Sequence, residues 1–291
     1  MNVRKGYLIL ILSMMSVVAM SQQIRNNYHS TIWWNEVNFK GKLNDKFFYQ
    51  IDFQYRTASD ATNKVGGDYN NPFTNMAQMQ FRPFFGYHLK ENVKFSIAPG
   101  LSPTWSNWRS SSPTFSMEYR FTAQLQFDQK YGRFSVTHRN RFEYRMGGTP
   151  IKTTNSAGDM FNGDAYSYDV AKERYRFRYM LRVLCPLNNK SIDKGTFYLN
   201  VYDEVCTAFG SNVASNQMLD QNRINIGLGY RTARDIRVEI GYLNQIQFYD
   251  ASKGTAAVTN AFHNNGVQLF LIFNDMKKLF KGEEAKVPVI Q

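Results

Sequence analysis

The sequence has no apolar run long enough to cross a membrane as a helix. Such a helix needs about 20 predominantly apolar residues, and the one stretch that approaches this, Tyr7 to Met20, is shorter. The mean hydropathy of the 291 residues is −0.46. These values exclude a bundle of membrane helices. A membrane β-barrel stays allowed, because only every second residue of its strands has to be apolar.

Cysteine is scarce, with only Cys185 and Cys206 in the chain. In the strand pattern described below, Cys185 falls on the apolar face of its strand and Cys206 on the polar face of the next. Side chains on opposite faces of a sheet cannot meet in disulfide geometry. The sequence therefore predicts two free thiols.

Motifs that carry catalysis or hold metals are missing. The chain contains no Gly-x-Ser-x-Gly, no His-Glu-x-x-His and no Cys-pair metal spacing. Of the four histidines, His138 shares a strand face with Asn140, but the flanking residue on that face is Val136 rather than a serine nucleophile. We therefore predict no catalytic residue, no metal site and no cofactor, and do not expect an enzyme.

Carboxylates are outnumbered, with 23 Asp and Glu against 35 Lys and Arg, for a formal net charge of +12. A chain this basic raises the question of nucleic acid. The arginines, however, are spread along strand-like segments and do not cluster in a tail or helix, and no recognition motif is present. No nucleic-acid partner is predicted.

What the chain has in abundance is aromatic residues in an alternating pattern. Residues 219–231 place Ile224, Ile226 and Leu228 on one face and Arg223 on the other, as expected of a β-strand with one apolar and one polar face. Phe and Tyr, 23 and 18 in number, supply much of the apolar face elsewhere. The same alternation predicts eleven strands, over residues 28–39, 47–56, 78–89, 93–101, 115–127, 139–145, 174–183, 197–205, 219–231, 236–248 and 267–273.

The connections between these strands alternate between short and long. Short periplasmic turns and long external loops are typical of an outer-membrane barrel, and Trp105 and Trp108 in one long connection suit a membrane–water boundary. The predicted fold is an all-β, transmembrane, up-and-down antiparallel β-barrel. Because single-chain bacterial barrels have an even number of strands, we expect about twelve (10–12), the twelfth hidden in a long loop or near the N-terminus. The alternative is that a short leader passes through the lumen.

The N-terminus resembles a secretory signal peptide. Arg4 and Lys5 precede the apolar stretch, and Ala19-Met20-Ser21 fits a small-x-small cleavage site. A single membrane anchor is the alternative, disfavoured by the short length. We predict a signal peptide over 1–21 cleaved near Ser21, an outer-membrane barrel over 22–273 and a basic C-terminal tail over 274–291, with the mature protein in the cell outer membrane.

Several motifs are similar to those of one protein family. Asp220-Gln221-Asn222-Arg223 runs into Gly227-Leu228-Gly229-Tyr230, and Gly241-Tyr242-Leu243-Asn244-Gln245 follows. Together with 174–179 and 202–205, these segments resemble the DUF2490 family of proteins of unknown function. Its members are described as outer-membrane barrels, many of them from Bacteroidota. The resemblance covers most of the mature chain and is sharpest over 174–248; it implies fold and location but no activity.

The last predicted strand also resembles the signal that the outer-membrane insertion machinery reads. Asn264, Gly266, Leu269 and Leu271 match a polar-x-Gly-x-x-apolar-x-apolar spacing. The alternative reading is an ordinary hydrophobic strand. The predicted partners are accordingly outer-membrane lipid and that machinery, with a small solute as a further candidate.

If the apolar face meets lipid, the charged face lines the lumen. The predicted lumen or constriction residues are Arg120, Arg139, Arg141, Glu143, Arg174, Arg176, Arg178, Arg182, Glu204, Arg223 and Glu239. Arginine pairs well with carboxylates through its planar fork, so these side chains either fill and stiffen the barrel or narrow a pore that prefers anions. The alternatives are an outer-membrane lipid-modifying hydrolase and a soluble exported β-barrel binding protein with the aromatic face turned inward.

Overall fold

The computed structural model describes residues 24–59, 71–73, 75–105, 115–148, 150–152, 166–168, 172–211, 213, 218–250 and 258–276. Among these residues no helix has the length and apolar character needed to cross a membrane. The predicted signal peptide, Trp108, nearly all of the loop after residue 148 and most of the basic tail lie outside the described residues.

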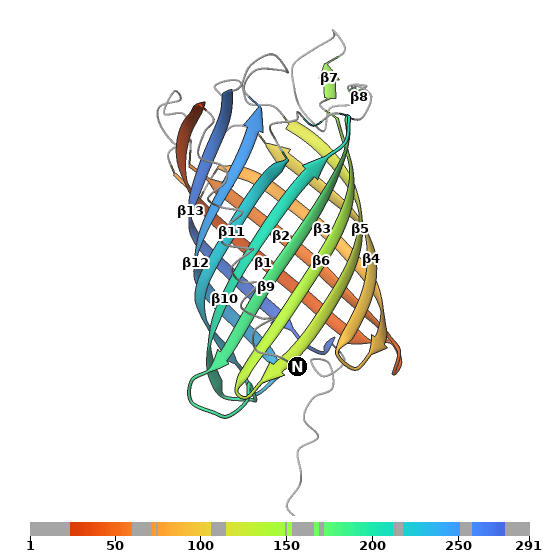
Figure 1. The fold of residues 1–291 in the computed structure, drawn as a ribbon, viewed down its shortest axis with the longest axis vertical. Helices are drawn as coiled ribbons and strands as arrows, with labels where there is room; N and C mark the ends of the chain where they lie inside the picture. The colour runs from red at the N-terminus through yellow and green to blue at the C-terminus, as the bar shows by residue number, and fades with distance from the viewer. Residues whose placement is uncertain are drawn as a thin grey trace, which may run out of the picture.

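The chain forms a closed barrel of long, tilted strands joined mainly by hairpins (Figure 1). The barrel strands are β1 (Ile24–Lys42), β2 (Phe47–Ala58), β3 (Met76–Lys90), β4 (Val93–Trp105), β5 (Phe115–Tyr131), β6 (Phe134–Gly148), β9 (Lys172–Pro186), β10 (Thr196–Phe209), β11 (Leu219–Arg231), β12 (Ile236–Asp250) and β13 (Val258–Phe273). Two further strands, β7 (Pro150–Lys152) and β8 (Tyr166–Tyr168), pair with each other outside the barrel. The predicted all-β barrel is confirmed, with strands at all eleven predicted positions.

The barrel has eleven strands, within the predicted range but one fewer than the twelve expected. Hairpins reverse the chain at every connection, so in a barrel with an odd number of strands the first and last run in the same direction. Accordingly β1 and β13 pair in parallel, from Ile24 opposite Val258 to Phe39 opposite Phe273, while every other barrel pair is antiparallel. The expectation of a wholly antiparallel barrel is therefore wrong at this one seam.

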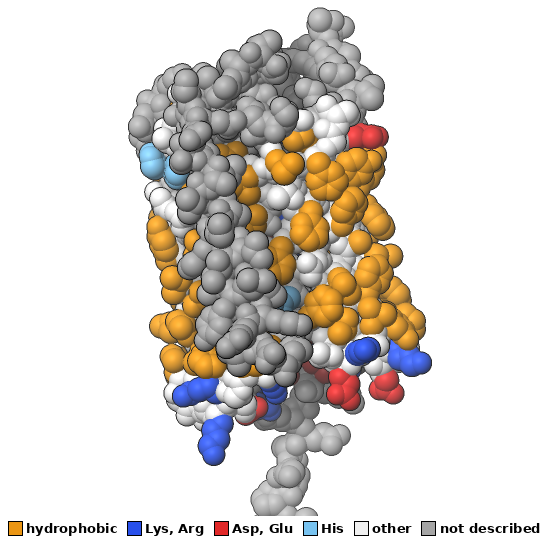
Figure 2. Space-filling model, viewed as in Figure 1, with side chains coloured by type: hydrophobic (Ala, Val, Ile, Leu, Met, Phe, Trp, Pro, Cys, Tyr) orange, Lys and Arg blue, Asp and Glu red, His pale blue; other side chains and the backbone are white. Residues whose placement is uncertain are grey.

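The two faces of the strands have opposite chemistry, as the alternating pattern predicts. The apolar rows lie outside: Phe85, Phe121 and Ile226 are 49%, 49% and 54% exposed. Arg82 and Glu143 point inward and are fully buried. On the face shown in Figure 2, hydrophobic side chains form a broad band and charged side chains gather at the end with the short turns. The apolar rows of the strands therefore lie outside and are not turned inward, as the soluble alternative needs.

Glycine at one position lets the barrel close. Gly266 of β13 lies opposite Ile32 of β1, and a Cβ at this position would overlap the carbonyl oxygen of Ile32. Because that oxygen belongs to the backbone, it cannot be moved aside as a flexible side chain could. The close approach of the two strands at the seam therefore requires glycine.

The two cysteines are free thiols, as predicted. Cys206 is buried on the inner face of β10, and Cys185 is half-buried on the neighbouring strand β9. In register, Cys206 lies opposite Arg178, and Cys185 lies opposite Leu199. The two thiols therefore lie on opposite faces of the sheet, as the alternating pattern predicted.

We predict that Gly266→Ala prevents normal closure of the β1–β13 seam. Overpacking a well-packed site costs about 1–3 kcal/mol, and a collision with backbone should reach at least the upper end of that range. Refolding of the purified variant, followed by circular dichroism and thermal unfolding, measures the loss. Gly147→Ala is the matched control, since its Cβ would lie 3.6 Å from the nearest atom, Glu118 Cγ; equal stability of both variants would contradict the prediction.

Candidate functional site: the charged lumen

Glu204 of β10 is the centre of an ion-pair cluster inside the barrel. The Arg178 guanidinium donates to both of its carboxylate oxygens, at 2.9 and 2.8 Å. Arg223 donates to it at 2.7 Å and Arg139 at 3.0 Å. Glu204 is 2% exposed, so this single carboxylate balances guanidinium groups from the two neighbouring strands and from β6.

A second carboxylate, Glu143 of β6, extends the cluster across the lumen. Arg178 donates to Glu143 at 2.7 Å, so its guanidinium bridges Glu143 and Glu204. Arg176 and Arg82 approach Glu143 at 3.8 Å each. Arg82 comes from β3, which is not a neighbour of β6 in the sheet. This contact therefore joins walls of the barrel that no backbone hydrogen bond connects.

Asp52 of β2 completes the connection on the far side. Its carboxylate lies 3.3 Å from Arg82 Nη2 and 3.6 Å from Arg141 Nη2. Asn38 and Gln50 donate to its other oxygen at 2.8 and 2.6 Å. Asp52, Glu143 and Glu204, with the arginines that contact them, form what we call the lumen lattice. It spans the barrel interior from β2 to β11.

The structure brings nearly all of the predicted lumen residues into such contacts. Beyond the lattice, Arg120 pairs with Glu118, and Glu239 accepts from Arg182 and, at 2.7 Å, from the Tyr198 hydroxyl. Arg174 is the exception: it makes no ion pair with a described residue. The other ten, all with side chains inside the barrel and in ion pairs, are Arg120, Arg139, Arg141, Glu143, Arg176, Arg178, Arg182, Glu204, Arg223 and Glu239.

Trp34 is a lumen residue that sequence reasoning missed. Its indole is 2% exposed inside the barrel, and the guanidinium carbons of Arg56 and Arg223 lie 3.4 and 4.9 Å from the ring centroid. Such cation–π contacts stabilise the Arg56 guanidinium, which has no ion pair with a described carboxylate, and add to the pairing of Arg223 with Glu204. The available signal was parity, because Trp33 lies on the outer face and the next residue must point inward.

Towards the long loops the lumen is filled by apolar side chains. Ile32, Trp34, Ala58, Ala77, Leu243 and Phe262 form one buried cluster. Tyr28 stacks on Phe262, with ring centroids 4.9 Å apart. Most of these residues share the parity that the alternating pattern assigned to the polar face. Ala77 is the exception, because it has the parity of Met79. The lumen lattice is therefore covered by an apolar layer on that side.

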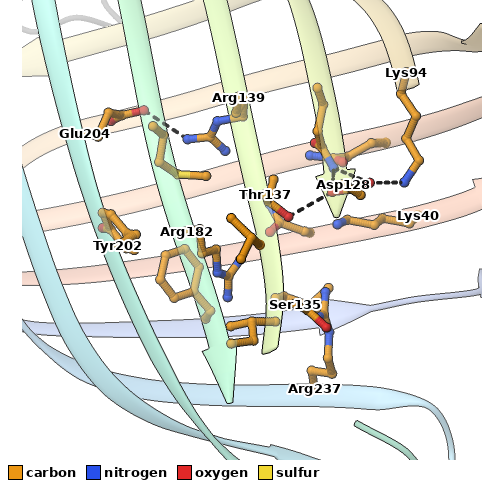
Figure 3. Close-up of a pocket in the computed structure, with 18 of the residues that line it drawn as sticks. Lys40, Lys94, Asp128, Ser135, Thr137, Arg139, Arg182, Tyr202, Glu204 and Arg237 are labelled. Carbon is orange, nitrogen blue, oxygen red and sulfur yellow. Dashed lines mark hydrogen bonds and ion pairs between the residues drawn. The ribbon is translucent and has the colours of Figure 1, made fainter. Parts of the chain in front are cut away.

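Between the lumen lattice and the short turns lies a cavity of about 1000 Å³, which we call the turn-side cavity. On one wall Lys94 of β4 pairs with Asp128 of the adjacent strand β5 at 2.8 Å, and Thr137 donates to the same carboxylate at 2.8 Å (Figure 3). One wall is apolar, made of Met180, Tyr202, Phe270 and Ile272. Ten lining residues are Lys or Arg and four are Asp or Glu. Four of the arginines pair with carboxylates behind the lining, Asp52, Glu143, Glu239 and Asp235, so basic groups still outnumber acidic ones.

Some polar side chains interrupt the apolar outer surface. His138 Nδ1 lies 2.8 Å from the Tyr179 hydroxyl, and Asn222 donates to Asp203 at 2.7 Å. Among the described residues no group of three or more His, Cys, Asp or Glu could hold a metal ion. His138 thus has a tyrosine partner on the outer wall, and the lumen candidates lie on the other side of the sheet.

We predict that Glu204→Gln destabilises the barrel by about 3–5 kcal/mol, the usual cost of removing one partner from a buried ion pair. The neutral amide leaves Arg178, Arg223 and Arg139 without their shared counter-charge. Chemical denaturation of the refolded protein measures this loss. Glu91→Gln makes the same change at an exposed position in a short turn and should stay within about 0.5 kcal/mol of the wild type; a comparable effect of both substitutions would refute the role of Glu204.

Comparison with known proteins identifies a family and no characterised relative. A search of the curated proteins finds no match. The family model described as "Protein of unknown function (DUF2490)" matches residues 31–255, from β1 through the end of β12. This span includes the lumen lattice and confirms the resemblance seen in the motifs between 174 and 248. The chain belongs to the DUF2490 family.

Proposed function

We propose that this protein is an outer-membrane β-barrel that admits small anionic solutes to a narrow, largely filled lumen and catalyses no reaction. The observation that carries the proposal is the inverted distribution of side chains: hydrophobic rows cover the outside, and charged groups are buried inside. A soluble protein avoids exposing apolar patches larger than a few hundred Å². Lipid covers such a surface at no cost.

The position of the charges supports a membrane location. Exposed charged side chains lie beyond the apolar band, at the end with the short turns. They are Lys42, Lys46, Lys90, Glu91, Lys130 and Arg133. Aromatic side chains at the strand ends include Trp105, which packs on Phe115 with ring centroids 5.4 Å apart. Aromatic girdles above and below an apolar band are typical of membrane barrels. In the proposed orientation the short turns face the periplasm.

The lumen lattice supports a narrow path. Arg141 reaches from β6 to Asp52 of β2, and Arg82 from β3 to Glu143 of β6. Side chains that bridge opposite walls occupy the cross-section that a wide pore would leave open to water. We infer that the barrel is a mechanically stiff wall element with, at most, a constricted route for small solutes.

The surplus of lysine and arginine supports the anion preference. Rings of Arg and Lys favour anions in selective pores, and the turn-side cavity has ten such residues against four carboxylates. An anion that enters from the short-turn end therefore meets an attractive field, and a cation meets a repulsive one.

The residue spacing in the last strand supports the outer-membrane insertion machinery as a partner. The glycine of this spacing also has a structural role. Gly266, part of the proposed signal, is also required for the close approach to Ile32. A Gly266 variant with an insertion defect in cells therefore does not by itself establish recognition. Leu269 and Leu271, on the outer face of β13, are the better positions for testing that partner.

We predict that Ile226→Arg costs about 2–4 kcal/mol of folding stability in lipid vesicles, the cost of a lipid-facing arginine near the bilayer centre. Ile226 is 54% exposed near the middle of β11. Leu43→Arg is the control, because Leu43 is 51% exposed but lies in a short turn, where the cost should be about 0–1 kcal/mol. Urea titration of both variants measures the difference; small and equal effects, in protein that needs no detergent, would reject the membrane location.

We predict a small conductance that favours anions when the refolded protein is inserted into planar bilayers. In a salt gradient the reversal potential should have the sign expected for a current carried mainly by anions. The reason is that the lining carries more Lys and Arg than Asp and Glu. Boiled protein serves as the control. A large, non-selective conductance would reject the constricted lumen, and cation selectivity would reject the proposed anion preference.

A further inference from the structure

Two basic side chains in the turn-side cavity have no ion-pair partner among the described residues. Lys40 of β1 and Arg237 of β12 line it, and neither makes an ion pair or hydrogen bond with a described residue. Arg237 Nε is buried with no hydrogen-bond partner. The two strands are separated only by β13, where Ile272 lies opposite both Arg237 and Asn38. Lys40 and Arg237 therefore project into the same end of the lumen, as Figure 3 shows.

The carboxylates of the cavity are engaged elsewhere. Asp128 accepts from Lys94 and Thr137, Glu204 accepts from three arginines, and Glu36 accepts from Asn38 and Gln54 at 3.2 and 2.8 Å. Glu91 is exposed at the rim. Asp52 attracts Lys40 and Glu239 attracts Arg237 from a distance, but both carboxylates are paired with other arginines. No described carboxylate forms an ion pair with Lys40 or Arg237. Buried or half-buried charges without partners are costly, and an anionic ligand would remove that cost.

The apolar wall adjoins these two cations. Phe270 and Ile272 of β13 are 8% and 1% exposed, and with Met180 and Tyr202 they form one packed surface on the cavity. The Arg182 guanidinium lies 5.9 Å from the Phe270 ring centroid. The cavity thus presents an apolar surface and a cationic pair side by side. Most of the cavity lining is polar, but this part of it combines an apolar surface with charged groups, as sites for small organic ligands do. A volume of about 1000 Å³ is at the upper end of their size range.

We propose that the turn-side cavity is a binding site for a small organic anion, with a phosphate or carboxylate head carried on an apolar or aromatic body. The head lies between Lys40 and Arg237, and the body packs against Phe270 and Ile272. This inference deepens the proposed anion preference by naming the solute class. It requires saturable binding and does not require that the lumen conduct, so the two proposals can fail separately.

The experiment is calorimetric titration of the full-length, refolded protein in a non-ionic detergent, because anionic detergents belong to the proposed ligand class. The probes are phenyl phosphate, inorganic phosphate and benzyltrimethylammonium. We expect saturable binding of phenyl phosphate, at least tenfold weaker binding of inorganic phosphate, and no binding of the cation. Absence of saturable phenyl phosphate binding would overturn the site, and equal binding of both phosphates would overturn the role of the apolar wall.

Substitutions locate the binding. Lys40→Gln and Arg237→Gln should each weaken phenyl phosphate binding about tenfold, while Lys40→Arg and Arg237→Lys should retain most of it. Neither residue holds a structural ion pair, so the variants should fold; an unchanged circular dichroism melt verifies this. Lys46→Gln is the matched control, since Lys46 lies exposed in the adjacent turn and outside the cavity. Binding that is equally weakened by Lys46→Gln, or unaffected by the two cavity substitutions, would assign the anion to the general surface charge.

Discussion

Three buried carboxylates, Asp52, Glu143 and Glu204, neutralise guanidinium groups in the interior of this barrel. A guanidinium group cannot lose its proton at ordinary pH, and leaving one uncompensated in a dry interior costs several kcal/mol. Each of the three carboxylates contacts arginines from more than one strand. The ion pairs therefore do more than neutralise charge: they couple walls that the sheet itself connects only around the circumference.

The lumen has a layered composition as a result. Apolar side chains around Phe262 fill it towards the long loops, the lumen lattice fills the middle, and a cavity with surplus positive charge remains near the short turns. The three layers follow from which residue types occupy inward positions along each strand. A barrel of eleven strands is wide enough to require such filling, since eight strands already leave room for side chains.

Much of the architecture could be predicted because a strand alternates its faces without ambiguity. Ile226 and Arg223 differ in parity, so one had to lie outside and the other inside, and the structure has them so. The closure could not be predicted, because no local pattern encodes which strand the first one meets. The general rule of even strand numbers predicted a twelfth strand. The barrel instead closes by parallel pairing of its first and last strands, beginning with Ile24 opposite Val258. Partners across the lumen were equally hidden: Arg178 and Glu204 lie on adjacent strands and could be guessed, whereas Arg82 and Glu143 come from strands that do not touch.

The parallel seam also sets the order in which the molecule can fold. Nearly all barrel strands pair with a neighbour in sequence, but the seam joins partners such as Ser30 and Asn264, which are 234 positions apart. Contacts this distant in sequence form late, because the loop entropy must be lost before they are gained. Until β13 arrives, the growing sheet has two unpaired edges, on β1 and on the latest strand made, and unpaired edges are templates for aggregation. The chain is therefore most vulnerable to mispairing with other chains during the interval before its final sixteen residues of strand, Val258–Phe273, are in place.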